Sequence, residues 1–193
     1  MKVTAGAMKG RRISTRGVGG ASEFGALRAT GAKVREAIFN ILGPMHPSPV
    51  LDLFAGTGAL GIEALSRGAS HATFVERDPR ALSALHRNLR TFSLAERARV
   101  IDSKVDVALH RLSEGKAEKF AWVFVDPPYA AGQVESVLAL LSGGALLDTG
   151  AVVIVEHDRH NIPPEKVGVL ELVDRRFYGD TGLSFYRRQR ELD

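Results

Sequence analysis

Short apolar runs alternate with amphipathic stretches over most of the chain after residue 50. The runs predict strands at residues 50–54, 72–76, 98–102, 120–125 and 150–155. Between them, apolar side chains recur at helical spacing, which predicts helices at residues 59–67, 79–91, 104–112 and 133–142. Repeated strand–helix units predict an α/β fold, with a parallel sheet covered by helices on both faces. Residues 167–177 and 182–188 flank a glycine-containing turn and predict a terminal antiparallel hairpin.

The N-terminal segment departs from this repeat. Residues 2–13 alternate in part and contain Gly6 and Gly10, which predicts a small β-hairpin. Residues 14–27 are rich in glycine, serine and threonine and predict a loop. Residues 30–42 place their apolar side chains on one stripe and predict a helix.

The composition is that of an ordinary globular domain. Hydrophobic residues make up 45% of the 193 residues, and no apolar run approaches the roughly 18 residues that a membrane span needs. The first residues lack the apolar core of a signal peptide, which favours a cytoplasmic protein. The chain has no cysteine, so disulfides, thiolate metal sites and cysteine nucleophiles are excluded.

Charge is distributed unevenly along the chain. Residues 1–35 carry eight basic side chains against Glu23 alone, a net charge of +7, whereas the remaining residues sum to −3. A basic arm on a near-neutral core is typical of a phosphate-binding surface, and the alternative is a solvated tail. We therefore predict that the arm contacts RNA. The candidate RNA-binding residues are Lys9, Arg11, Arg12, Arg28, Lys33 and Arg35.

The first strand of the repeat runs into a glycine-rich turn. Gly56, Gly58 and Gly61 have the spacing of the dinucleotide-binding fingerprint. Glu76 lies 20 residues after the first of them, where that fingerprint places an acid for a ribose. The loop alone is therefore compatible with a nicotinamide or flavin enzyme, which is the first of two alternatives for the cofactor.

Charge favours the other alternative, S-adenosylmethionine. A dinucleotide places its anionic pyrophosphate at the helix N-terminus, where Asp52 and Asp126 would repel it. S-adenosylmethionine has no phosphate and carries a sulfonium and an ammonium, which suit two carboxylates. Glycines allow close backbone approach to its methionine end, and Glu76 can accept from both ribose hydroxyls. The candidate cofactor-binding residues are Asp52, Phe54, Ala55, Gly56, Gly58, Glu76, Arg77, Val105 and Asp126.

The tetrapeptide Asp126-Pro127-Pro128-Tyr129 directly follows a predicted buried strand. Consecutive prolines fix φ and remove two N–H donors, so the backbone is stiff and rich in acceptors. The Asp126 carboxylate and the Pro127 carbonyl can each accept one hydrogen of an amino group, and the Tyr129 ring can stack on a planar base. The motif indicates a site for an exocyclic amino group, although a tight loop is the simpler alternative. Asp126, Pro127, Pro128 and Tyr129 are the candidate catalytic residues.

Two histidines follow the fifth predicted strand, in His157-Asp158-Arg159-His160. A metal site would need a third ligand at suitable spacing, which the sequence does not offer. We therefore predict no metal.

Several segments together resemble the RsmD-type 16S rRNA guanine-N2 methyltransferases. Asp126 to Tyr129 is similar to that family's catalytic motif. The other similar segments are 3–6 with 9–12, 28–30 with 34–40, and 51–69. Ala29 stands where the family usually has proline, and Ser103-Lys104-Val105 stands where it often has an Asp or an Asn-Ala pair near the adenine. We therefore assign the adenine contact to the backbone N–H of Val105, with Asp102 and Asp106 as open alternatives.

The resemblance implies a class I methyltransferase fold, with a mostly parallel seven-stranded sheet over residues 28–193 and an RNA-binding appendage over residues 1–27. It implies transfer of a methyl group from S-adenosylmethionine to N2 of one guanine in 16S rRNA, which leaves S-adenosylhomocysteine. The expected partner is 16S rRNA within a 30S subunit or an assembly intermediate, and the expected state is a monomer. The alternatives are a DNA adenine-N6 methyltransferase, a protein glutamine-N5 methyltransferase, or a non-catalytic ribosome-assembly factor.

Overall fold

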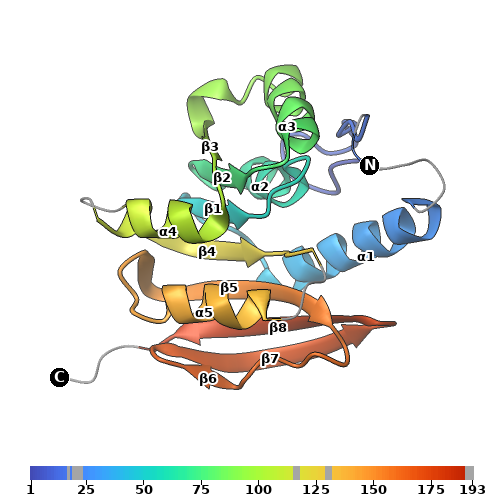
Figure 1. The fold of residues 1–193 in the computed structure, drawn as a ribbon. Coiled ribbons are helices and arrows are strands. Elements are labelled where there is room, and N and C mark those ends of the chain that lie inside the picture. Colours follow the sequence, from blue (N-terminus) through green and yellow to red (C-terminus); the bar gives the residue numbers. More distant parts are fainter. Residues whose placement is uncertain (17, 19–23, 115–117, 129–131, 190–193) are drawn as a thin grey trace.

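The computed structural model describes residues 1–16, 18, 24–114, 118–128 and 132–189 (Figure 1). Its helices are α1 (Phe24–Leu42), α2 (Ala59–Ser66), α3 (Pro79–Thr91), α4 (Val105–Ser113) and α5 (Gln133–Leu141), with a short 3-10 turn at Ala95–Arg97. Its strands are β1 (Val50–Leu53), β2 (Ala72–Glu76), β3 (Ala98–Asp102), β4 (Phe120–Val125), β5 (Leu147–Asp158), β6 (Lys166–Val167), β7 (Leu170–Tyr178) and β8 (Thr181–Arg188).

The described strands form one mixed sheet in the order β3-β2-β1-β4-β5-β8-β7-β6. Strands β1 to β5 pair in parallel, and β8, β7 and β6 add to them antiparallel. This confirms the predicted parallel core with a terminal hairpin. The sheet has eight strands and not seven, because the two-residue strand β6 pairs with the outer edge of β7.

Helices cover both faces of the sheet, as Figure 1 shows. On one face α1, α2 and α3 pack in a core that includes Phe39, Ile62 and Phe124. On the other face α4 and α5 pack in a second core that includes Leu109 and Leu138. Strand β4 is buried along its whole length, which explains why it appears in the sequence as an uninterrupted apolar run.

The N-terminal arm, residues 1–14, lies against α2 and α3. The β-hairpin predicted for residues 2–13 was wrong, because the antiparallel contact is limited to one isolated bridge between Lys2 and Arg12. The physical reason is that backbone N–H groups of the arm bind a side chain of α2 and not a neighbouring strand. The N–H groups of Thr4 and Ala5 donate to the Glu63 carboxylate of α2, at 2.9 and 3.0 Å, and so do not form a strand ladder.

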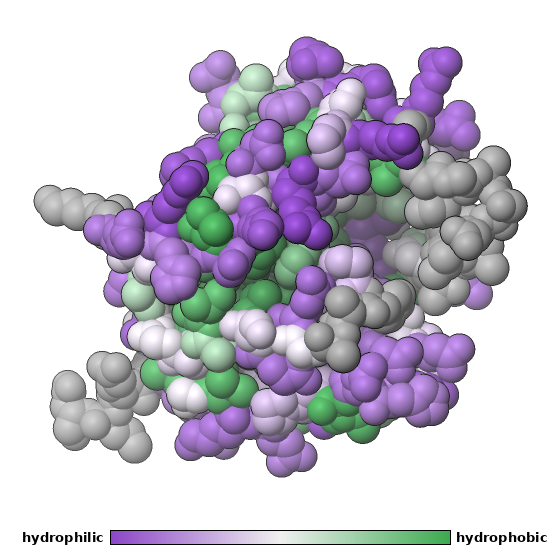
Figure 2. Space-filling model, in the orientation of Figure 1, coloured by the Kyte–Doolittle hydropathy of each residue, from purple (hydrophilic) through white to green (hydrophobic). Residues whose placement is uncertain are grey.

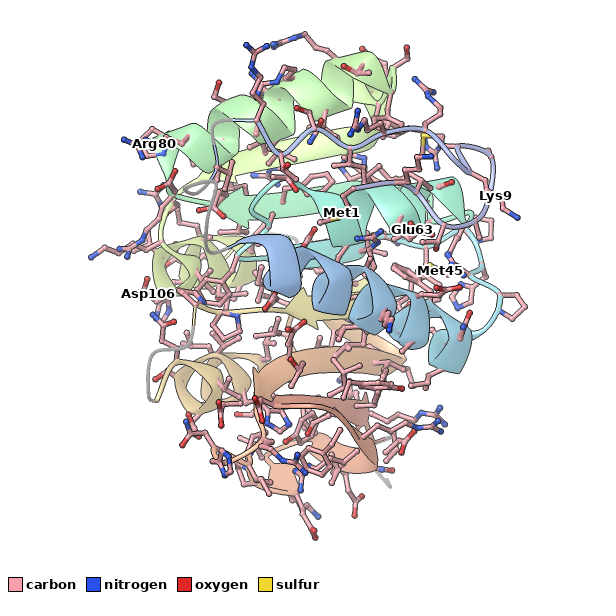
Figure 3. The ribbon with its side chains drawn as sticks, turned by 90° about the vertical axis from the view of Figure 1, so that its right-hand side faces the viewer. Met1, Lys9, Met45, Glu63, Arg80 and Asp106 are labelled. Carbon is pink, nitrogen blue, oxygen red and sulfur yellow. The ribbon has the colours of Figure 1, made fainter. Side chains whose placement is uncertain are left out.

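Glu63 is the anchor of this arm. Its buried carboxylate also accepts from the Thr4 hydroxyl at 2.6 Å and from Arg67 Nε at 2.9 Å. Arg35 of α1 lies 3.6 Å away from it, as an ion pair. Figure 3 shows Glu63 between the arm and α1. Although burial alone would raise it, hydrogen bonds from Thr4 and Arg67 hold the pKa of Glu63 below its ordinary value.

Helix α1 begins at Phe24, earlier than the predicted residue 30. Gly31 therefore lies inside the helix, where a single glycine costs about 1 kcal/mol and does not by itself end a helix. Among the residues described, none of the helices is both long and apolar enough to cross a membrane.

Candidate functional site

Four carboxylates lie at the carboxyl ends of four neighbouring strands. Glu76 ends β2, Asp52 is in β1, Asp126 follows β4, and Glu156 is near the end of β5. These strands are adjacent in the order β2-β1-β4-β5, so the acids form a row along one edge of the sheet. Figure 2 shows the surface hollowed on its right-hand side, toward which these strands run. A parallel α/β sheet commonly binds its ligand at this edge.

The loop after β1 has the geometry of a tight backbone cradle. Phe54, Gly56 and Gly58 have φ values of 59°, 55° and 80°, in the left-handed region. Phe54 is not a glycine, so its conformation carries strain of the kind that is common at functional sites. A Cβ at Gly58 would lie 2.4 Å from Leu85 Cδ1 of α3, so a larger residue would have to displace that side chain and also adopt a left-handed φ.

Asp52 of β1 binds the first turn of α2, which follows this loop. It is buried, and its Oδ2 accepts the Gly61 N–H at 2.8 Å. Burial raises the pKa of Asp52 well above its ordinary value, and the nearby charges of Asp126 and Glu76 raise it further, although the Gly61 N–H acts against them. The direct contact of Asp52 is therefore with the backbone of the first turn of α2, and an effect on a cofactor ammonium would act over a longer range.

Glu76 accepts hydrogen bonds from three backbone N–H groups. Its Oε2 accepts from Gly56 at 2.7 Å, and its Oε1 accepts from Arg77 and Asp78 at 2.7 and 2.8 Å. A carboxylate offers about four acceptor positions, so one remains for a ligand hydroxyl. A second hydroxyl would have to displace one of these N–H groups. Asp78 caps α3 by accepting from Arg80 and Ala81.

Asp126 and Pro127 follow β4 directly. Asp126 opens to solvent, whereas Pro127 is buried. Although part of its side chain reaches solvent, burial of the carboxyl among the surrounding protein atoms raises the pKa of Asp126 to about 6. The predicted acceptor pair therefore lies at the end of a rigid, buried strand. Tyr129 lies outside the described residues.

A pocket of about 410 Å³ opens beside this motif. Pro127 and Pro128 line it together with Glu156 from β5 and Ile162 after β5. Glu156 was not among the candidate residues predicted from the sequence. The only signal in the sequence is that Glu156 follows an apolar run, as Asp126 does. That the two residues lie next to each other depends on the register of β4 with β5, which only the structure shows.

The remaining cofactor candidates lie along the same edge. Ala55 is buried, and its N–H donates to the Val75 carbonyl at 3.0 Å. Arg77 is exposed, and Val105 is the buried first residue of α4. Ser103, just before α4, donates its N–H to the Glu76 carbonyl at 3.0 Å. The segment after β3 is thus held next to Glu76, as an adenine contact near residue 105 requires.

The basic candidates separate into exposed and anchored side chains. Lys9, Arg12 and Lys33 are exposed, and Figure 3 shows Lys9 pointing away from the body of the protein. Arg11 lies over the Phe92 ring at 4.5 Å and donates to the Thr91 carbonyl at 2.5 Å. Arg35 is buried and donates to the Lys2 carbonyl at 2.7 Å, so in this conformation it holds the arm. The Arg28 side chain lies outside the described part.

His157 is a packed residue of the sheet. It is buried, and its ring nitrogens contact the Asp158 carbonyl at 2.8 Å and Ser184 Oγ at 2.9 Å. Burial lowers the pKa of His157. Within the described residues, no group of three or more acidic, histidine or cysteine side chains could hold a metal ion.

Comparison with known proteins identifies a family. The model of the family described as Conserved hypothetical protein 95 matches residues 1–187. YlbH of Bacillus subtilis, named provisionally as an rRNA methyltransferase, is 39% identical over 98% of this chain and 100% of its own. Ribosomal RNA small subunit methyltransferase D of Escherichia coli is 34% identical over 98% of this chain and 90% of its own. The solved structure of yhhF from Escherichia coli, named provisionally as a methyltransferase, has 32% identity and a TM-score of 0.82, with 98% of each chain covered.

Proposed function

The chain belongs to the RsmD/YlbH family, described as Conserved hypothetical protein 95, and from this premise we propose that it methylates N2 of a guanine in small-subunit rRNA. The family is one of S-adenosylmethionine-dependent methyltransferases. The proposed substrate is 16S rRNA, within a 30S subunit or an assembly intermediate, and the proposed setting is the cytoplasm. The protein would act as a monomer.

The observation that carries the proposal is the position of Asp126 and Pro127. They follow a buried strand whose neighbour β1 leads into the glycine loop, so an acceptor pair lies next to the cofactor cradle. The two prolines limit backbone motion there. An amino group held by these two acceptors would have its lone pair directed toward the methyl donor.

In the proposed cofactor site, the loop at Gly56 and Gly58 faces the methionine end and Glu76 accepts from the ribose. The row of carboxylates suits a cationic cofactor and disfavours a pyrophosphate. The cofactor would supply the methyl group on its sulfonium and leave as S-adenosylhomocysteine. No metal takes part in this proposal.

The protein's contribution to the chemistry is placement. Guanine N2 is a weak nucleophile, because its lone pair is delocalised into the ring. Acceptors on both of its N–H bonds help the nitrogen to pyramidalise. Alignment within about 3 to 3.5 Å of the methyl carbon then supplies much of the rate. The base must leave its stack to reach this edge, and Tyr129 is our candidate for stacking on it.

The test is methyl transfer from labelled S-adenosylmethionine by the purified protein. The substrate is small-subunit particles from a strain that lacks the gene, and the product is identified by nucleoside chromatography. We expect the label in N2-methylguanosine, and its loss with Asp126→Ala. Label in another nucleoside, or an Asp126→Ala variant as active as the wild type, would refute the proposal.

A further inference from the structure

Two carboxylates lie side by side at the proposed reaction centre. Strands β4 and β5 pair in parallel with Val125 opposite Val155, and Asp126 and Glu156 are the next residues along each strand. Neighbouring strands lie about 4.8 Å apart. The two side chains are close enough for the charge of Asp126 to add to burial in raising the pKa of Glu156, to about 8.

Glu156 has no structural role that explains this costly position. It is partly buried, and within the described residues only burial and the charge of Asp126 act on its carboxylate, with no hydrogen bond or ion pair. Glu63 provides the contrast, because it accepts hydrogen bonds from the arm and from Arg67. A partly buried acid next to a second acid is unfavourable unless a ligand supplies donors to both.

The pocket beside these acids has the size and lining for a base. Its volume of about 410 Å³ falls within the range of about 300 to 1,000 Å³ that is usual for small-molecule sites. Pro127, Pro128, Val134 and Ile162 give it apolar surface, and Glu156 supplies a carboxylate. Glu135 and Asp158 also line it, and this negative charge disfavours a phosphate.

Guanine is the RNA base that offers two neighbouring donors to a pair of acceptors. Its ring N1–H and its 2-amino group are attached to the same carbon and point to the same side. In adenine and in cytosine, the ring nitrogen beside the amino-bearing carbon carries a lone pair and no hydrogen. An ionised carboxylate opposite that nitrogen would therefore accept from guanine and repel the other two bases.

We infer that Glu156 is a specificity-determining residue, which accepts the guanine N1–H while Asp126 accepts from the amino group. The inference rests on the proposed function and adds to it the means of selecting the base. In the free protein, a proton relieves the repulsion between the two acids. In the complex, the two donors of the base take over that role.

The test is the Glu156→Gln variant, which keeps the size of the side chain and removes its charge. The amide can still turn its oxygen toward the guanine N1–H, but this acceptor carries no charge, and its NH2 group can instead donate to the ring nitrogen of adenine or cytosine. Losing a hydrogen bond to a charged group should lower kcat/KM for guanine by about 10- to 100-fold. Affinity for S-adenosylmethionine, measured by calorimetry, should stay within twofold of wild type, which also shows that the variant folds.

The matched control is Glu171→Gln, the same substitution at an exposed position of β7, which should keep wild-type activity. Glu156→Asp keeps the charge but withdraws it by one methylene, and should lose activity while it keeps guanine as its base. Transfer by Glu156→Gln within twofold of the control would overturn the inference. A wild-type protein that labels a base other than guanine would refute the proposed function itself, so the two failures are distinct.

If Glu156→Gln fails to fold, the need for a carboxylate at the position of Glu156 can be tested with Glu156→Asp. Its guanine turnover should fall at least tenfold with unchanged cofactor affinity. A Glu156→Asp variant with the turnover of the wild type would also overturn the inference, because the reach of the side chain would then be irrelevant.

Discussion

At the scale of single residues, the carboxylates of the strand ends have different tasks because their surroundings differ. Asp52 is buried under the glycine loop and accepts the Gly61 N–H. Glu76 is partly exposed and accepts three backbone N–H groups, with one position left over. Asp126 and Glu156 repel each other and have no donor among the described residues. Only the last pair is left with its acceptors open to a substrate.

Replacing Glu76 with alanine should weaken binding of S-adenosylmethionine by about 1.5 to 3 kcal/mol, the usual contribution of hydrogen bonds to a charged group. The Gly56 N–H would also lose its acceptor, so the loop should loosen. Calorimetry measures the affinity, and Glu96→Ala, in the turn before β3, is the control. Equal affinity of the Glu76→Ala and wild-type proteins would mean that the ribose is held elsewhere.

Activity should rise with pH between about pH 6 and pH 8, the pKa values to which Asp126 and Glu156 are raised. Both acids accept hydrogen bonds when ionised, so protonation at lower pH removes an acceptor and lowers kcat/KM. His157, His160, Glu135 and Asp158 line the same pocket.

Glu156→Gln separates these contributions. In this variant the rise near pH 8 should disappear and the rise near pH 6 should remain. A profile of the same shape in both proteins would show that Glu156 does not titrate in the reaction.

At the scale of elements, the sequence predicted the central strands well and the arm poorly. Strands β2, β3 and β4 begin and end where the apolar pattern placed them. For β2 and β4 the reason is that buried parallel strands are apolar on both faces. Strand β3 lies at the edge of the sheet and is only partly buried, yet its short apolar run has the predicted bounds. The arm depends on Glu63, a partner 59 residues from Thr4, which local patterning cannot reveal. Glu156 was missed for the same reason, because the register of β4 with β5 decides that it lies next to Asp126.

Replacing Glu63 with glutamine should undock the arm. The carboxylate is fully buried, and removing one member of a buried ion pair costs about 3 to 5 kcal/mol because the partner charge is left unpaired. Denaturant unfolding should show this loss, and protease should cleave residues 1–14 faster. Glu36→Gln, on the exposed side of α1, is the control. A loss below about 1 kcal/mol would mean that the apolar contacts of Val3, Met8 and Ile13 hold the arm without it.

At the scale of the whole molecule, the charges divide between two surfaces. Acids occupy the carboxyl edge of the sheet, where a cationic cofactor and the donor edge of a base would bind. Exposed basic side chains such as Lys9 and Arg12 lie on the arm, which is docked on α2 and α3 and not free in solvent. We propose that the arm holds RNA phosphates while the edge receives one base.

Replacing Lys9 and Arg12 with alanine should weaken binding of rRNA or 30S particles. Each lost phosphate contact should flatten the dependence of log affinity on log salt by about 0.7 to 0.9. Affinity for S-adenosylmethionine should not change, because both side chains are exposed on the arm and neither belongs to the proposed cofactor site. Lys119→Ala with Lys166→Ala removes the same charge outside the arm and should leave the slope as it was. If log affinity depended on log salt with the same slope in the arm variant and in this control, the arm would be a solvated surface that does not contact RNA phosphates.

The most direct measurement of the central claim is the methylation state of 16S rRNA in cells. The gene is deleted from its own organism and restored either as wild type or as Asp126→Ala, and the modified nucleosides of the rRNA are mapped by mass spectrometry. We predict that one N2-methylguanosine disappears on deletion, returns with the wild type and stays absent with Asp126→Ala. An unchanged set of modified guanines in the deletion strain, or full restoration by Asp126→Ala, would contradict the account.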